Sequence, residues 1–98
     1  MFSEYTHAAN ELTHEIRQLS FSAADCIEEI RAQYGVRAAY LAAFALIIYR
    51  ERLRRTGKAS DREDLRSYLY YEEMKGNAKA IELYEAAAGY LMPEKARR

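Results

Sequence analysis

The feature that most restricts how this chain can fold is a stretch of twelve residues without charge, 38–49, within the sequence RAAYLAAFALIIYRERLRR. A membrane-spanning helix needs about twenty apolar residues, whereas twelve residues rising about 1.5 Å each cover about 18 Å of a hydrocarbon core about 30 Å thick. Arg37 and Arg50 border the stretch. We therefore expect a helix buried in protein and no membrane span. A helix that is apolar all round is either central or meets another subunit with its second face.

Length and composition favour one small all-helical domain. The 98 residues leave no room for two hydrophobic cores, so we treat 1–98 as a single domain. Half of the residues are hydrophobic and 31% are charged, which argues against disorder. Four glycines and one proline give too few turns for a fold of many strands.

The N-terminal third carries a heptad pattern. Apolar or small residues recur at alternating steps of three and four, which is typical of a helix with one packing seam: Phe2, Tyr5, Ala9, Leu12, Ile16, Leu19, Ala23, Cys26 and Ile30. Because the pattern keeps its phase through residues 20–22, we favour one long helix. The alternative is a pair of helices with a turn there, since Ser22 and Asp25 resemble a capping box and a single helix would expose Phe21.

Two glycines delimit the second helix. Glycine is the usual residue just past a helix end, so Gly35 and Gly57 predict a helix over 36–56. Small side chains in this helix would allow neighbouring helices to approach closely: Ala38, Ala39, Ala42, Ala43 and Ala45.

The remaining chain predicts two more helices. Ser60 and Glu63 form a capping box that opens a helix to about residue 75. The last helix is expected over about 77–92, and residues 93–98 form a charged tail that we expect to fray. The expected fold is a small all-α helical bundle. It has a long N-terminal heptad-patterned helix, or a helix pair, and three further helices.

Charge is unevenly spread, although the formal net charge is +0. Residues 1–34 carry two positive and six negative charges, whereas residues 35–60 carry six positive and one negative. Most of these cations follow the uncharged stretch: Arg50, Arg52, Arg54, Arg55 and Lys58. Cations are favoured in the last turn of a helix, which explains the cluster without a function. The alternative is a patch that contacts nucleic-acid phosphates, although no aromatic stacking platform accompanies it.

Residues 30–44 resemble a helix-turn-helix motif, with Gly35 in the turn. A recognition helix presents polar side chains to base edges. Here the candidate readers are Arg37, Ala38, Ala42 and Ala43, and alanine cannot read a base. A plain helical hairpin is the better interpretation.

Two other features of the sequence could in principle form a metal site or a catalytic site. Glu4 with His7 and Glu11 with His14 repeat a spacing seen in di-iron bundles, but both copies fall on one helix, where we expect a solvated face. Cys26 lies on the heptad seam and is expected to be a small buried residue. We therefore expect no metal, no cofactor and no catalytic residue, and we interpret the protein as non-enzymatic.

Residues 65–74 predict a helix with two apolar faces. Leu65 and Leu69 share one face, whereas Tyr70, Tyr71 and Met74 lie on the other. Tyrosine and methionine are enriched at interfaces, so Tyr70, Tyr71 and Met74 are our interface candidates. The alternative is that the N-terminal helix covers this face within one chain.

Together these patterns favour a helical protein-protein interaction module, a subunit, adaptor or inhibitor. We expect a homodimer that also binds another protein through apolar helix faces. The alternative is a nucleic-acid-associated protein that uses the basic 50–58 segment. With one cysteine and no signal peptide in evidence, we expect a cytoplasmic protein that does not engage a membrane.

Overall fold

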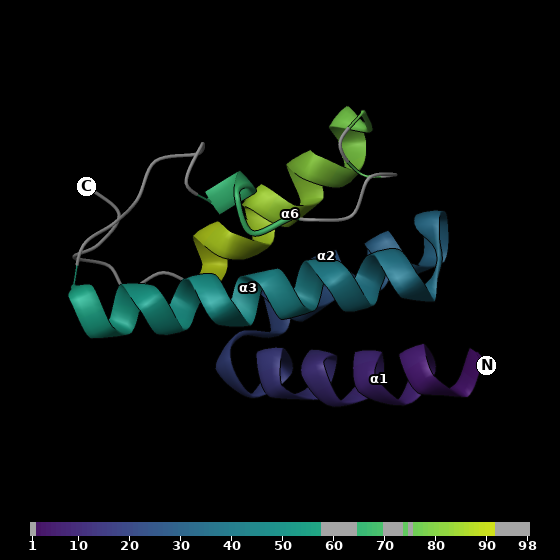
Figure 1. Cartoon of the computed structure of the whole chain (residues 1–98), viewed down its shortest axis with the longest axis horizontal. Helices are drawn as coiled ribbons and strands as arrows, with labels where there is room; N and C mark the ends of the chain where they lie inside the picture. The colour runs from purple at the N-terminus through teal and green to yellow at the C-terminus, as the bar shows by residue number, and fades with distance from the viewer. Residues whose placement is uncertain (1, 58–64, 70–73, 75, 92–98) are drawn as a thin grey trace.

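The computed structural model describes residues 2–57, 65–69, 74 and 76–91, and these form a small all-α helical bundle (Figure 1). This part of the chain contains four helices and no strand: α1 (Phe2–Leu19), α2 (Phe21–Tyr34), α3 (Val36–Thr56) and α6 (Ala78–Leu91). The predicted fold class is therefore confirmed. The helices expected over 36–56 and 77–92 correspond to α3 and α6, whereas the predicted tail at 93–98 lies outside the described residues.

The heptad segment forms two helices, so the prediction of one long helix is wrong. Ser20 separates them with extended backbone, φ −163° and ψ 121°. Its side-chain oxygen accepts a hydrogen bond of 3.2 Å from the backbone N–H of Ala23, which caps α2. The cap is thus Ser20 and not the predicted Ser22. Each helix of the pair buries part of the seam, including Ile16 and Ile30, so the apolar pattern continues although the helix does not.

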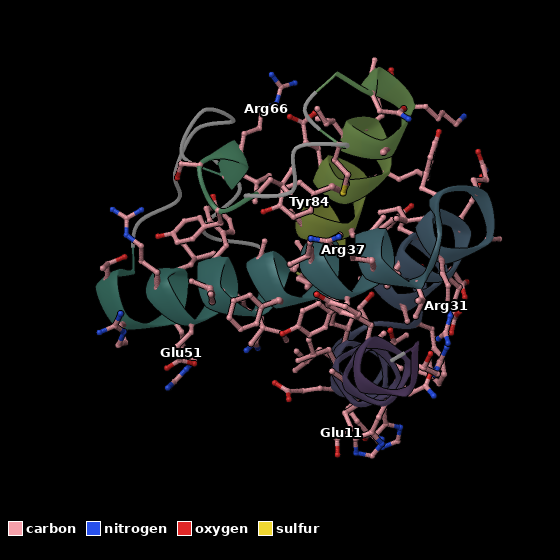
Figure 2. The ribbon with its side chains drawn as sticks, turned by 45° about the vertical axis from the view of Figure 1, so that its right-hand side comes forward. Glu11, Arg31, Arg37, Glu51, Arg66 and Tyr84 are labelled. Atoms are coloured by element: carbon pink, nitrogen blue, oxygen red, sulfur yellow. The ribbon has the colours of Figure 1, made fainter. Side chains whose placement is uncertain are left out.

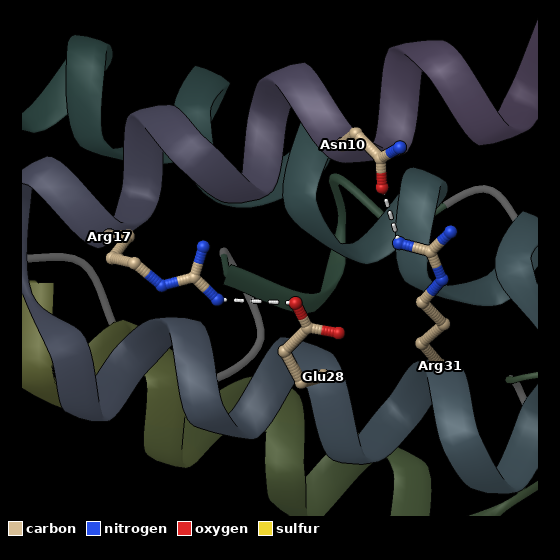
Figure 3. Close-up of polar contacts among 4 residues, drawn as sticks. All are labelled: Asn10, Arg17, Glu28 and Arg31. Atoms are coloured by element: carbon tan, nitrogen blue, oxygen red, sulfur yellow. Dashed lines mark hydrogen bonds and ion pairs between the residues drawn. The ribbon is translucent and has the colours of Figure 1, made fainter.

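Polar contacts join α1 and α2 along their exposed edge (Figure 3). Arg17 of α1 forms an ion pair of 3.2 Å with Glu28 of α2, and Arg31 Nη1 donates a hydrogen bond of 2.6 Å to Asn10 Oδ1. The later residue of α1 meets the earlier residue of α2, so the two helices are antiparallel. Exposed pairs of this kind contribute at most about 1 kcal/mol, so apolar burial stabilises the hairpin more than they do.

The helices are arranged with α2 and α3 in the middle. α1 packs against both of them from one side and α6 packs against both from the other. In Figure 1, α3 lies in front of α2, with α1 below and α6 above. The shortest dimension of the molecule is 19 Å, which is about two helix diameters. One side of α3 therefore forms part of a broad face of the molecule.

Small residues on α3 allow this close arrangement. All five alanines singled out in the sequence are fully buried: Ala38, Ala39, Ala42, Ala43 and Ala45. Larger side chains from the neighbouring helices fill the space around them, among them Ile16 of α1, Ile27 of α2 and Tyr84 of α6. The expectation that these alanines support close helix packing is therefore confirmed.

The helix predicted over 60–75 is not continuous. Leu65 and Arg66 are helical, but Ser67 and Tyr68 form a turn, and 58–64 and 70–73 lie outside the described residues. As expected for one apolar face, Leu65 is buried and both Tyr68 and Leu69 pack against the core.

A buried hydrogen bond ties this segment to α6. The Tyr84 hydroxyl donates to the Leu65 carbonyl oxygen at 2.9 Å. Burial raises the pKa of the Tyr84 hydroxyl, and the nearby Tyr49, Tyr68 and Glu85 raise this pKa further. The hydroxyl therefore stays protonated and can donate throughout the neutral range.

We predict that Tyr84→Phe lowers the free energy of unfolding at pH 7 by about 1–3 kcal/mol, because it leaves the buried Leu65 carbonyl without a donor. The raised pKa means that the folded state retains the proton when the unfolded chain, with a pKa of about 10, loses it. The stabilisation from this group is thus complete below pH 10 and declines above it, by at most about 1.4 kcal/mol per pH unit.

Urea denaturation of both proteins between pH 7 and pH 11 measures this effect. The other tyrosines are shared and cancel in the comparison, so the difference between the two proteins should shrink above pH 10. If the free energies of unfolding of the two proteins instead differ by the same amount at every pH, the pKa of Tyr84 is the same in the folded and the unfolded chain.

A single residue, Gly35, links α2 to α3. Its N–H donates to the Arg31 carbonyl at 3.0 Å and closes α2, while its carbonyl accepts from the Ala39 N–H at 3.2 Å and opens α3. Its φ of 100° and ψ of 166° fall in a region that only glycine occupies readily. The backbone angles therefore require glycine here, although an added Cβ would meet nothing within 4 Å.

We predict that Gly35→Ala lowers the free energy of unfolding by about 1–3 kcal/mol through backbone strain alone. Gly89→Ala is the matched control, since Gly89 lies inside α6, has no positive φ and also has open space around a new Cβ. The free energy of unfolding of the control should rise by about 0.5–1 kcal/mol, because alanine has a higher helix propensity than glycine. Urea denaturation of both variants tests the pair, and equal effects would contradict the strain argument.

Candidate interaction surface

The side of α3 opposite its alanines is apolar as well. Leu41, Phe44 and Ile48 recur at steps of three and four, so they project from one side of the helix. Phe44 is 40% exposed, and Leu41 and Ile48 are half-buried. Exposed Arg37 lies one heptad before Phe44, and exposed Glu51 lies one heptad after it. The outer face of α3 therefore consists of Arg37, Leu41, Phe44, Ile48 and Glu51.

Aromatic contacts with α1 hold Phe44 in place. The Tyr40 and Phe44 rings stack with centroids 6.0 Å apart and an interplanar angle of 17°. Tyr40 in turn meets Tyr5 of α1 edge-on, with centroids 5.6 Å apart. Stacked and edge-on rings at these distances attract beyond simple burial. Phe44 is therefore an exposed apolar side chain in a supported orientation, which suits an anchor at a protein contact.

The two charged side chains of the outer face, Arg37 and Glu51, also make contacts within the chain. The Arg37 guanidinium carbon lies 5.6 Å from the centroid of the Tyr5 ring, within the range of a cation–π contact. Glu51 forms an ion pair of 2.8 Å with Arg54. The hydrogen bond from Arg54 lowers the pKa of the Glu51 carboxyl, and the charge of Arg54 lowers this pKa further, so Glu51 is ionised at neutral pH. Figure 2 shows Arg37 and Glu51 toward opposite ends of α3.

Of the three predicted interface residues, Met74 is the one that the structure describes. Met74 is 2% exposed and belongs to the core, so it agrees with the alternative in which the chain covers this side chain itself. Tyr70 and Tyr71 lie outside the described residues and stay predictions. Helical spacing in the sequence separates two faces but does not tell which of them the same chain covers.

The predicted basic residues are not gathered on one side of α3. At 100° per residue, Arg50 and Arg54 share a side, Arg52 lies nearly opposite, and Arg55 lies between. Arg50 and Arg52 are half-buried, Arg54 is paired with Glu51, and Lys58 lies outside the described residues. This arrangement gives no continuous cationic stripe along the described part of the helix.

The helix-turn-helix interpretation is wrong. Ala38, Ala42 and Ala43 are fully buried against the other helices, so they cannot face a base edge. Of the four candidate readers, Arg37 alone is exposed. The segment is a helical hairpin with Gly35 at its turn.

The two histidines considered as metal ligands contact neighbours on their own helix, α1. His7 pairs with Glu11 at 3.3 Å and His14 contacts Gln18 at 3.2 Å, all of them exposed. Within the described residues, no group of three or more histidine, cysteine or acidic side chains could hold a metal ion. Cys26 is half-buried, and burial followed by the charges of Glu29 and Asp25 raises the pKa of its thiol. The thiol is therefore protonated at neutral pH.

Residue spacing in the sequence did not single out the outer face of α3 as a set of site residues. The available signal was the uncharged stretch itself, which is apolar on both sides of its helix and lies between opposite charges. None of the described helices combines the length and the apolar character that a membrane span requires. Comparison of the chain with protein-family models, curated proteins and solved structures found no match.

Proposed function

We propose that this protein is a small protein-protein interaction module that binds through the outer face of α3 and acts as a homodimer. The observation that carries the proposal is the environment of α3. Its neighbours α1, α2 and α6 pack around the alanine side, while Phe44 and its two apolar neighbours face outward. Helices that present anchors at steps of three and four are a common means of protein recognition.

The size of the surface bears on the strength of the contact. Fully burying an apolar side chain contributes about 1.5–3 kcal/mol, and Leu41 and Ile48 are already half-buried. Association also costs several kcal/mol in lost freedom of motion. We therefore expect a dimer that forms at micromolar rather than nanomolar concentration.

Two further parts of the proposal rest on general arguments. A lone, half-buried cysteine suits a reducing compartment, so we propose a cytoplasmic location. A second protein that competes for the same apolar face would make the module an adaptor or an inhibitor. The scattered basic residues of α3 give no specific support to nucleic-acid binding, so we do not propose it.

We predict that Phe44→Glu converts a dimer into a monomer of 11.4 kDa. A charge buried in the contact without a partner would cost several kcal/mol, whereas glutamate is well tolerated in a helix. Loss of the Tyr40 stack should lower the monomer's stability by only about 0.5–1.5 kcal/mol. Sedimentation equilibrium at micromolar concentration measures the mass, and circular dichroism checks the helical content.

Phe21→Glu is the matched control for this change. Phe21 is 73% exposed, and it begins α2 rather than lying on α3. The same substitution should therefore leave association unchanged. A wild-type protein that stays monomeric, or a Phe44→Glu variant that still dimerises, would refute the proposed function. A mobility shift with duplex and single-stranded nucleic acid at low salt tests the other class of function.

A further inference from the structure

We propose that two copies of the chain pack with their α3 helices antiparallel, about a two-fold axis at Phe44, so that Arg37 of each copy meets Glu51 of the other. This inference rests on the proposed function and specifies the partner and its orientation. The partner of the outer face is then the outer face itself.

The apolar residues of the outer face match one another about this axis. A two-fold axis at Phe44 places each residue before it opposite a residue equally far after it on the other copy. Leu41 and Ile48 lie three residues before and four residues after Phe44 on the same side of α3, so Leu41 of one copy then lies beside Ile48 of the other. The outward-facing residues nearest the axis are therefore all apolar, and Phe44 meets Phe44. A surface that complements itself in this way is what a two-fold contact requires.

The charges of the outer face also favour the antiparallel arrangement. Arg37 and Glu51 are equally far from Phe44, about 10.5 Å along the helix at 1.5 Å per residue. The antiparallel arrangement therefore brings opposite charges together at both ends. A parallel arrangement in register would instead bring Arg37 against Arg37 and Glu51 against Glu51. Like charges at both ends disfavour that alternative.

The crossing angle decides whether these side chains can meet. Helices that pack at about 20° stay close over two heptads, whereas a crossing near 50° separates them more quickly. Arg37 and Glu51 both have long side chains, so the shallower crossing brings them within reach. We therefore infer the geometry typical of coiled coils and four-helix bundles for this contact.

Both charged groups are in place before association. Arg37 rests over the Tyr5 ring, and the Glu51 carboxylate is oriented by Arg54, which donates to Oε1 at 3.4 Å and to Oε2 at 2.8 Å. A carboxylate has about four lone-pair positions, so Glu51 can accept from a second arginine. Side chains that are already oriented lose less freedom on binding.

Charge reversal tests the arrangement. Arg37→Glu and Glu51→Arg each create two like-charge contacts in the symmetric dimer, so each should weaken dimerisation by about tenfold or more. The double variant Arg37→Glu, Glu51→Arg restores opposite charges at both ends with the net charge unchanged. Its dimer dissociation constant should return to within about threefold of the wild-type value.

Mixing the two single variants gives a second readout. In a mixed dimer, one copy carries glutamate at both positions and the other carries arginine at both, so both contacts are again favourable. The mixed dimer should therefore outcompete either parent dimer. Sedimentation equilibrium gives the dissociation constants, and native mass spectrometry separates the three dimers by mass.

Lys79→Glu and Glu82→Arg are the control pair. Both residues are exposed on α6, and the substitutions change net charge by the same amounts as those on α3. These variants should dimerise like the wild type and mix without strong preference. Preferential mixing of the controls would attribute the effect to net charge and overturn the inference.

The outcomes separate the arrangement from the proposed function. Suppose that the wild type dimerises and the Phe44→Glu variant does not. Suppose also that both single charge-reversal variants dimerise normally, or that the double variant dimerises more weakly than either of them. The outer face would then remain the binding surface, and the antiparallel arrangement would be wrong. A wild type that does not dimerise would remove the proposed function and this inference together.

Discussion

The bundle depends on the close packing of helices against the alanine side of α3. Ala38, Ala42 and Ala45 are fully buried and their side chains are single methyl groups, so three helices can pack against α3 in a chain of 98 residues. Leu46, Tyr49 and Leu53 of the same helix are buried as well. Leu41, Phe44 and Ile48 lie on its other side. A helix that is apolar all round is thus buried on one side, whereas Phe44 on its other side is partly exposed.

The elements that the sequence predicted well are those with local causes. Gly35 and Gly57 fix the ends of α3 because both adopt positive φ, where glycine alone has little strain. The break at Ser20 was missed because the apolar pattern reports which residues are buried and not whether the helix between them is continuous. Phe21, which a single helix would expose, is also exposed in the helix pair, so it could not decide between them.

The candidate surface was harder to predict, because its position depends on which helices lie beside one another. The uncharged stretch indicated a second apolar face on 36–56, but residue spacing does not specify the side on which α1, α2 and α6 pack. Met74 illustrates the same limit, since its helical position suggested a surface while the chain covers it. Side-chain type predicts burial well, and it predicts much less well whether the covering group belongs to the same molecule.

The single-residue links at Ser20 and Gly35 also bear on the order in which the chain folds. The contacts of α2 with α1 and with α3 join helices that are neighbours in sequence, so they close short loops at little entropic cost. The packing of α6 on α2 joins segments far apart in sequence, and it closes the longest loop of the bundle. We expect the first three helices to assemble early and α6 to dock last. By the same reasoning, α6 is the element that can detach most easily, and its detachment would uncover buried apolar surface on α2 and α3.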